Sequence, residues 1–390
     1  MALTPITSQL RGAGREREVG HQARQALWIY LCTSTLLVLV LLNAGQIYAY
    51  TGVDPDAARV AAAYLEAVAW GVPPVVIYIA LRHVCEGMGK TRPPMIIAAS
   101  VLPINAFFNY VLIYGEFGFP ELGGVGCGIA TAVVFWLELL LMLFVVRMPF
   151  FRATDFFANF EGPQLRTIKT IALIGVPIGL SVFLEMAVHS VISFMIARIG
   201  VNELAAHSIA GNLNWLTYVI PMSIGSAASI RVGYHIGAGD LRAAKRTGGV
   251  AFKLSLVYAL TVSLLLVLFR YQLVSIYTTD FSVIGVATTL MLFIAVYQIV
   301  DDSQAVVIGV LRGYKDTRVP MMFALVGYWF IALPIGHFLA IGSFGAPLGL
   351  YGYWVGLTVG LTIVATCVGA RLLYLSRDEA HVLRLAAISD

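Results

Sequence analysis

Residues 171–197 read IALIGVPIGLSVFLEMAVHSVISFMIA, and Glu185, almost at the centre, is the one charged residue among these 27. Lys169 and Arg198 stand just outside the run. Apolar runs of 18 or more residues are typical of helices that cross a membrane. The stretch therefore predicts a membrane-spanning helix that carries a carboxylate within the apolar layer.

The same pattern recurs along the whole chain of 390 residues, of which 59% are hydrophobic and 12% are charged. Soluble domains are about a quarter charged, so most of this surface is expected to face lipid. Lipid accepts only helices and closed barrels, and these runs are too long for barrel strands. The sequence predicts an all-α polytopic membrane protein. About ten transmembrane helices are expected, at residues 27–49, 60–85, 93–114, 125–147, 168–198, 204–230, 248–276, 283–311, 319–341 and 348–375.

The net charge of +4 does not indicate a nucleic-acid partner, because the basic residues lie in alternate loops between the expected spans. The intervening loops carry one basic residue, Arg59. This alternation is the positive-inside pattern. It predicts that both termini and the basic loops lie in the cytoplasm.

Signals of other functions are incomplete. The segment GMGKT at 87–91 resembles the end of a phosphate-binding loop, but Val84 stands where that motif needs glycine, so no ATP site is expected. The four cysteines form no CxxC pair, which disfavours a zinc site. No nucleophilic set of Ser, His and Cys is recognisable. The sequence predicts neither an enzyme nor a bound cofactor.

The chain also repeats itself. The segment GMGKTRPPM at 87–95 aligns with GYKDTRVPM at 313–321, at an offset of 226 residues, and GAG at 12–14 matches GAG at 237–239. Matched loops on one side of the membrane indicate parallel repeats, a design of transporters that handle substrate between the halves. The predicted organisation is an N-terminal lobe, a cytoplasmic linker, a C-terminal lobe of six helices and a cytoplasmic tail, at residues 1–150, 151–166, 167–376 and 377–390.

The two repeats differ in length before their GAG segments. The second half begins near residue 165 and has about 70 residues, or two helices, before its GAG, whereas the first half has eleven. By symmetry, the first lobe is expected to have about four full helices and to lack its first two.

Ionisable residues inside a membrane are costly and usually face an internal cavity. Glu185, Asp301 and Asp302 are the acids well inside predicted spans. Such acids can hold a proton near neutral pH or bind a hard cation such as Na⁺ through oxygen. Tyr297 lies one turn before Asp301 and could assist, while Asp301 and Asp302 point about 100° apart, so one of them is expected to face Glu185. The alternative is a structural ion pair, which is disfavoured because no basic residue is expected at comparable depth.

Three further polar residues are candidates. His189 follows Glu185 by one helical turn and fits either a proton relay or a packing histidine. Asn105 and Asn109 form an i, i+4 pair in the first half. Hydrogen bonding between helices explains this pair as well as a cation or cargo site does.

Four segments resemble the multidrug and toxic compound extrusion (MATE) family, most closely its bacterial NorM-type branch. They are PMSIGSAASIRVGYHIGAGD at 221–240, LRGYKDTRVPM at 311–321, FGFPELGGVGCGIATA at 117–132 and AAHSIAGNLN at 205–214. The resemblance implies two six-helix lobes with a cargo cavity between them, and export of cationic drugs or dyes in exchange for Na⁺ or H⁺. It further implies that the family's first helix and most of its second are absent here.

The resemblance also implies roles for single residues. Glu185 in FLEMAVH and Asp301 in YQIVD match the family's carboxylates in its seventh and tenth helices, and would serve as Na⁺ ligands if sodium is the coupling ion. Tyr297 matches a tyrosine associated with the cation site. Asp302 stands where the family usually has a small residue.

The expected function is secondary active multidrug efflux from the bacterial inner membrane, with organic cations, Na⁺ or H⁺ and membrane lipids as partners. A flippase for lipid-linked precursors is one alternative, disfavoured because the predicted cavity residues are acidic rather than basic. A shortened chain that does not transport is the other.

Overall fold

The computed structural model describes residues 1–49, 54–159, 161–343 and 345–386, and within these ranges the regular structure is helical with no strand. The chain divides into two compact units, residues 3–172 with Met1 and residues 173–390 with Ala2. The linker predicted at 151–166 and the first two turns of the following helix thus group with the first unit.

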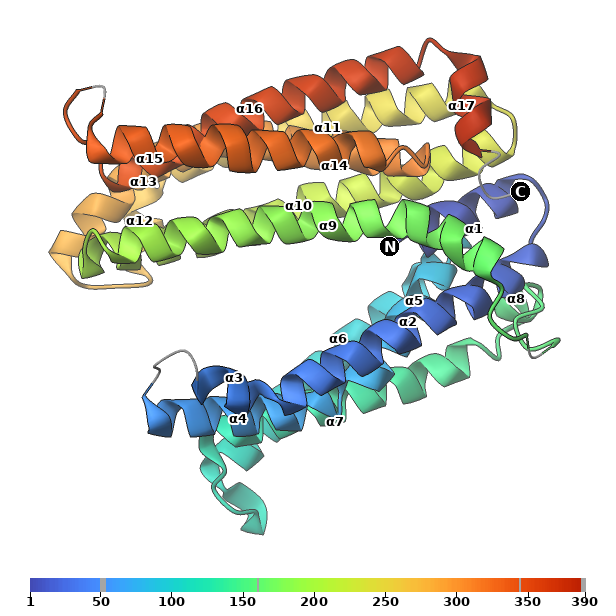
Figure 1. Ribbon diagram of the computed structural model, residues 1–390, viewed down its shortest axis with the longest axis horizontal. Helices are drawn as coiled ribbons and strands as arrows, with labels where there is room; N and C mark the ends of the chain where they lie inside the picture. Colours follow the sequence, from blue (N-terminus) through green and yellow to red (C-terminus); the bar gives the residue numbers. More distant parts are fainter. Residues whose placement is uncertain (50–53, 160, 344, 387–390) are drawn as a thin grey trace. The chain divides into compact units, whose positions relative to one another are not determined.

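The first unit begins with a buried helix, α1 (Leu3–Gly12), whose Leu3 and Ile6 are almost fully enclosed. It packs on α2 and α5. The remaining elements are α2 (Glu18–Leu42), α3 (Ala44–Ala49), α4 (Pro55–Ala69), α5 (Val72–Gly87), α6 (Arg92–Tyr114), the 3₁₀ turn η1 (Glu116–Gly118), α7 (Gly123–Val145) and α8 (Pro149–Arg152), as Figure 1 shows.

The second unit is built around α13, which packs against α10, α11 and α16 (Figure 1). Its elements are α9 (Leu165–Ala197), which starts in the first unit, α10 (Val201–Gly237), α11 (Leu241–Leu268), α12 (Arg270–Ser275), α13 (Phe281–Gly313), α14 (Arg318–Leu325), the π-helical segment η2 (Val326–Ala332), α15 (Leu333–Ile341), α16 (Leu350–Leu375) and α17 (Glu379–Ala386).

The helix boundaries confirm the internal repeat. In the first unit α5 ends at Gly87 and α6 begins at Arg92; in the second, α13 ends at Gly313 and α14 begins at Arg318. Both pairs of boundaries are separated by the offset of 226 residues seen in the sequence. Two similar sequence segments therefore make the same helix–turn–helix connection.

The number of spans is close to the prediction but not equal to it. Eight helices among the described residues are long and apolar enough to cross a membrane, and the pair α4 and α5, bent by 49°, makes a ninth if counted as one span. The predicted span at 204–230 falls on α10, which has 37 residues but is not among these. Its polar residues, including His207 and Asn214, lower its mean hydropathy, and these two residues line a cavity.

Close helix contact sets the position of α13 against α10. A Cβ atom added to Gly309 would overlap the backbone of Gly225, and one added to Gly225 would lie 2.9 Å from the carbonyl oxygen of Ala305. One turn later, a Cβ on Gly313 would lie 2.8 Å from the carbonyl oxygen of Ser229. Small residues four apart on both helices let the two backbones touch, as is common in membrane proteins.

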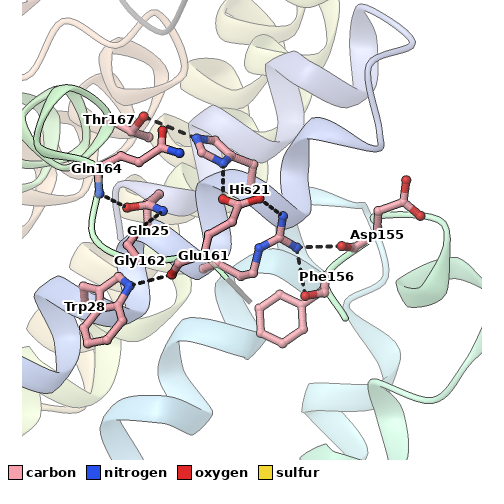
Figure 2. A network of polar contacts seen from close by, with 10 residues as sticks. His21, Gln25, Trp28, Asp155, Phe156, Glu161, Gly162, Gln164 and Thr167 are labelled. Carbon is pink, nitrogen blue, oxygen red and sulfur yellow. Dashed lines mark hydrogen bonds and ion pairs between the residues drawn. The ribbon is translucent and has the colours of Figure 1, made fainter. Parts of the chain in front are cut away.

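The segment predicted as the linker, which belongs to the first unit, is bound to α2 by a network of polar contacts (Figure 2). The Glu161 carboxylate lies 2.5 Å from Nδ1 of His21 and accepts a hydrogen bond of 2.6 Å from Arg24. Arg24 also donates to the carbonyl oxygens of Asp155 and Phe156, at 2.6 and 2.9 Å. Three residues of the predicted linker region are thereby fixed by one turn of α2.

Glu161 is the charged centre of this network. Partial desolvation acts to raise its pKa, but the hydrogen bonds from Arg24 and His21 outweigh that effect and hold the pKa of this carboxyl below its ordinary value of 4.5. A lowered pKa in the folded state stabilises the fold above the unfolded value. We expect that contribution to disappear as the pH falls below about 4.5 and through the lowered pKa.

Replacing Glu161 with glutamine is expected to loosen the linker. The substitution keeps the shape but removes the charge from two hydrogen bonds of a type worth about 1.5–3 kcal/mol each when one partner is charged. Limited proteolysis at neutral pH should cut residues 153–164 roughly tenfold faster. Glu116→Gln, at an exposed acid of the same unit, removes an equal charge and should leave the cutting rate unchanged. Equal rates in Glu161→Gln and the unsubstituted chain would show that the network does not hold the linker.

Candidate functional site

A cavity of about 320 Å³ lies inside the second unit, between residues of α9, α10, α13 and α16. Two acids line it: Glu185 from α9 and Asp301 from α13. Tyr297 and His189 line it as well. The structure thus brings together four of the seven candidate site residues, as two pairs that lie more than a hundred positions apart in the sequence.

Glu185 enters the cavity from the middle of α9, where the sequence places it in an otherwise apolar run. It is half-buried, and its carboxylate forms no hydrogen bond or ion pair with any residue that the structure describes. His189 lies one turn further along the same helix face. An unpaired carboxylate in an apolar setting is costly, and a site that binds a cation or a proton offsets that cost.

Asp301 and Tyr297 come from one face of α13. Asp301 is 4% exposed and Tyr297 is 1% exposed, and both reach the same cavity as Glu185. Asn214 of α10 lines the same cavity. The two acids and this amide thus share one enclosed space, although they come from three different helices.

Asp302 points elsewhere, as expected for a neighbour about 100° around the helix. It is 0% exposed, is not among the residues lining the cavity, and accepts a hydrogen bond of 2.8 Å from Nε2 of Gln298. Its second carboxylate oxygen has no hydrogen-bond partner among the described residues. Asp302 is therefore a buried polar neighbour of the site rather than part of its wall.

Asn105 and Asn109 belong to α6 of the first unit. Nδ2 of Asn109 donates to Oδ1 of Asn105 at 2.9 Å, so the pair bonds along one helix and not between two. The expected link between helices is not formed by this bond. Neither residue is among those lining the cavity of the second unit.

Sequence analysis missed a polar stripe on α10. His207, Gly211, Asn214 and Tyr218 line the cavity and follow one another at intervals of four, three and four residues. That spacing places them on one helix face. This spacing can be read from the sequence, but a search restricted to charged residues does not detect it.

A chain of hydrogen bonds that includes His207 holds the side chains of one side of the cavity in place. Nε1 of Trp354 donates to Nδ1 of His207 at 3.2 Å, and Oγ of Ser193 lies 2.9 Å from Nε2 of His207. Indole nitrogen can only donate, so Nδ1 of His207 accepts and its Nε2 carries the proton. Ser193 in turn donates to the carbonyl oxygen of His189 at 2.9 Å. His207 is thus a neutral residue that joins α9, α10 and α16.

One basic residue is closer to the acids than the sequence suggested. Arg312 lies on α13, and its charge acts on Glu185. No ion pair between Arg312 and an acid is present within the described part of the chain. Arg312 falls one residue beyond the predicted span at 283–311, and the expectation that no basic residue lies at the depth of Glu185 stays a prediction.

The donor set suits a hard cation or a proton. Two carboxylates, a phenol and an amide supply oxygen atoms, which Na⁺ and similar ions prefer. No group of three or more His, Cys, Asp or Glu residues that could hold a metal ion occurs in the described ranges.

The MatE family model matches residues 1–111 and 177–338. The chain belongs to the MatE family. Among curated relatives, the multidrug resistance protein MdtK of Edwardsiella ictaluri (strain 93-146) is 39% identical over 99% of this chain and 86% of its own length. The multidrug resistance protein NorM of Aliivibrio fischeri (strain ATCC 700601 / ES114) is 38% identical over 98% of this chain and 84% of its own length.

Solved structures of MATE transporters share the fold. A eukaryotic MATE transporter, AtDTX14, aligns with a TM-score of 0.87 at 20% identity, over all of this chain and 85% of that one. A MATE structure described as the bent conformation aligns with a TM-score of 0.87 at 16% identity, over 99% of this chain and 84% of that one. This MATE chain is therefore a multi-pass membrane protein with the family's fold, and membership in a family of transporters agrees with the prediction that it is not an enzyme.

Proposed function

We propose that this chain is a secondary active multidrug efflux antiporter that exports organic cations in exchange for Na⁺ or H⁺. The observation that carries the proposal is the meeting of Glu185 and Asp301 in one cavity, with Tyr297 beside them. The relatives named as multidrug resistance proteins support the efflux function.

Coupling follows from the electrostatics of the two acids. With both carboxylates charged, the cavity attracts a cation, and the two charges repel each other. Na⁺ or H⁺ at this site neutralises part of that charge, weakens the attraction for an organic cation and so favours its release. An ion can shift the balance between outward-open and inward-open states only if it binds one of them better. Arg312 reduces the net negative charge that the ion must offset.

Aromatic side chains give the cavity a surface for organic cations. Trp215, Tyr218 and Trp354 line it together with the acids. Ring faces attract cations, at about 0.5–2 kcal/mol for each well-placed contact. A volume of about 320 Å³ is at the lower end of ordinary ligand sites. The cavity therefore fits a compact aromatic cation better than a large one.

The setting proposed for this activity is the bacterial inner membrane, with both termini in the cytoplasm, as the alternation of basic loops favours. The partners are cationic drugs or dyes, the coupling ion and membrane lipids. The chemistry requires no ATP and no resident cofactor, because an ion gradient supplies the driving force.

Reconstituted vesicles test the proposal. The purified chain is placed in liposomes loaded with ethidium, and a Na⁺ gradient or a pH gradient is imposed separately. We expect ethidium movement under one of the two gradients and none after the gradient is collapsed. Ethidium movement that ignores both gradients, in protein that remains folded, would rule out antiport.

Substituting Asp302 with asparagine tests whether this buried acid, which does not line the cavity, takes part in ion-driven transport. Asparagine can still accept the hydrogen bond from Gln298, and the change removes a buried charge, which is costly without full pairing. Gradient-driven ethidium flux should stay within about twofold of the unsubstituted chain, and the unfolding temperature should be equal or higher. Loss of flux in Asp302→Asn would place this acid in the ion pathway.

A further inference from the structure

A second hollow, of about 570 Å³, lies between α10 and α11. The two helices are joined by residues 238–240 and run antiparallel as a hairpin. The hollow follows α10 from Ile224 to His235 and α11 from Ala243 to Leu254. Eleven steps along each helix, at 1.5 Å per residue, correspond to about 16 Å of groove.

Alanines of both helices line this groove. Ala227 and Ala228 lie on α10, and Ala243 and Ala251 lie on α11. Ala228 and Ala251 are buried, whereas Ala227 is exposed. Side chains that end at Cβ occupy little space and leave room along the groove.

The residues that line the groove change from basic to apolar along its length. Near the turn, Arg231 and His235 of α10 and Arg246 of α11 line it. Away from the turn, Ile224, Val250 and Leu254 line it. A groove with one basic end and one apolar end is suited to a ligand that has a charged part and an apolar part.

The two arginines at the basic end of the groove are exposed and can bind an anionic group. Arg231 and Arg246 are exposed, and neither forms an ion pair or a hydrogen bond with any described residue. No acid lines the groove. The nearest acid in the sequence, Asp240, caps α11 by accepting a hydrogen bond of 2.9 Å from the backbone N–H of Ala243.

We propose that the groove between α10 and α11 binds an anionic phospholipid. Arg231 and Arg246 contact the phosphate, and the apolar end receives the first part of an acyl chain. Basic pockets between transmembrane helices at the cytoplasmic side are suited to such headgroups. The apolar half of the groove distinguishes a lipid from free phosphate, which needs only the basic end.

Native mass spectrometry of the delipidated full chain tests the assignment, with dioleoyl phosphatidylglycerol as the probe and dioleoyl phosphatidylcholine as the zwitterionic control. Removing one basic residue near a membrane surface weakens attraction to anionic lipid about fivefold. The double variant Arg231→Gln/Arg246→Gln should therefore bind phosphatidylglycerol about 25-fold more weakly. The matched variant Arg242→Gln/Lys245→Gln removes two exposed charges of α11 outside the groove and should bind as the unsubstituted chain does.

A third variant, Ala227→Phe, fills the groove and leaves its charges in place, and it should also weaken binding. Unfolding temperatures close to that of the unsubstituted chain confirm that each variant is folded. Equal losses in the two double variants would mean that binding follows total charge, and would overturn the proposal. So would equal affinity for phosphatidylcholine, or displacement of phosphatidylglycerol by inorganic phosphate at the same concentration.

Discussion

Replacing Asp301 with asparagine is expected to abolish gradient-driven ethidium transport while leaving the protein folded. Asp301 is the more enclosed of the two acids in the cavity, and asparagine retains its shape without its charge. Removing one partner of a buried charged contact costs about 2–5 kcal/mol, which corresponds to roughly a 30- to 4,000-fold weaker affinity for the coupling ion. Initial rates of ethidium flux in proteoliposomes measure the effect.

Glu185→Gln provides the second half of this test. If the two acids hold one ion together, either substitution removes coupling, and the double variant is no worse than each single one. Asp302→Asn, at the adjacent position of α13, is the matched control because it removes the same charge one residue away. Full ion-driven flux in both Glu185→Gln and Asp301→Asn would show that the cavity acids do not couple transport.

The acids of the site could be recognised from the sequence because charge in an apolar run is rare. Glu185 and Asp301 each stand out in their own helix, and their spacing from Tyr297 is local. What the sequence did not reveal was which polar residues meet them. Asn214 and Trp354 join the site from α10 and α16, and such contacts depend on how helices pack, which no local pattern encodes.

In the fold, as in the site, local sequence patterns predicted some features and missed others. The repeat of 226 residues predicted two matching helix–turn–helix connections, and the boundaries at Gly87 and Gly313 confirm them. Hydropathy did not anticipate the bend of 49° between α4 and α5. A bend depends on local backbone geometry and on the packing of neighbouring helices, which a hydropathy average does not contain.

The strongest effect on stability is expected from Gly309→Ala at the crossing of α10 and α13. The new methyl group would overlap the backbone of Gly225, which cannot rotate away as a side chain could. The helices must therefore move apart, and overpacking of this kind costs about 1–3 kcal/mol or more. Because α10 carries Asn214 and α13 carries Asp301, the same movement widens the cavity and should lower ethidium flux together with the unfolding temperature.

Gly285→Ala is the matched control on the same helix. A Cβ at Gly285 meets nothing within 4 Å, so this substitution adds an equal methyl group without a clash. Alanine also favours a helix over glycine by about 1 kcal/mol, and Gly285→Ala should be neutral or stabilising. Since 1 kcal/mol corresponds to about 2–4 °C for a unit of this size, the two variants should unfold several degrees apart. Equal unfolding temperatures would show that the helices yield at Gly309, and that close backbone contact does not hold the site together.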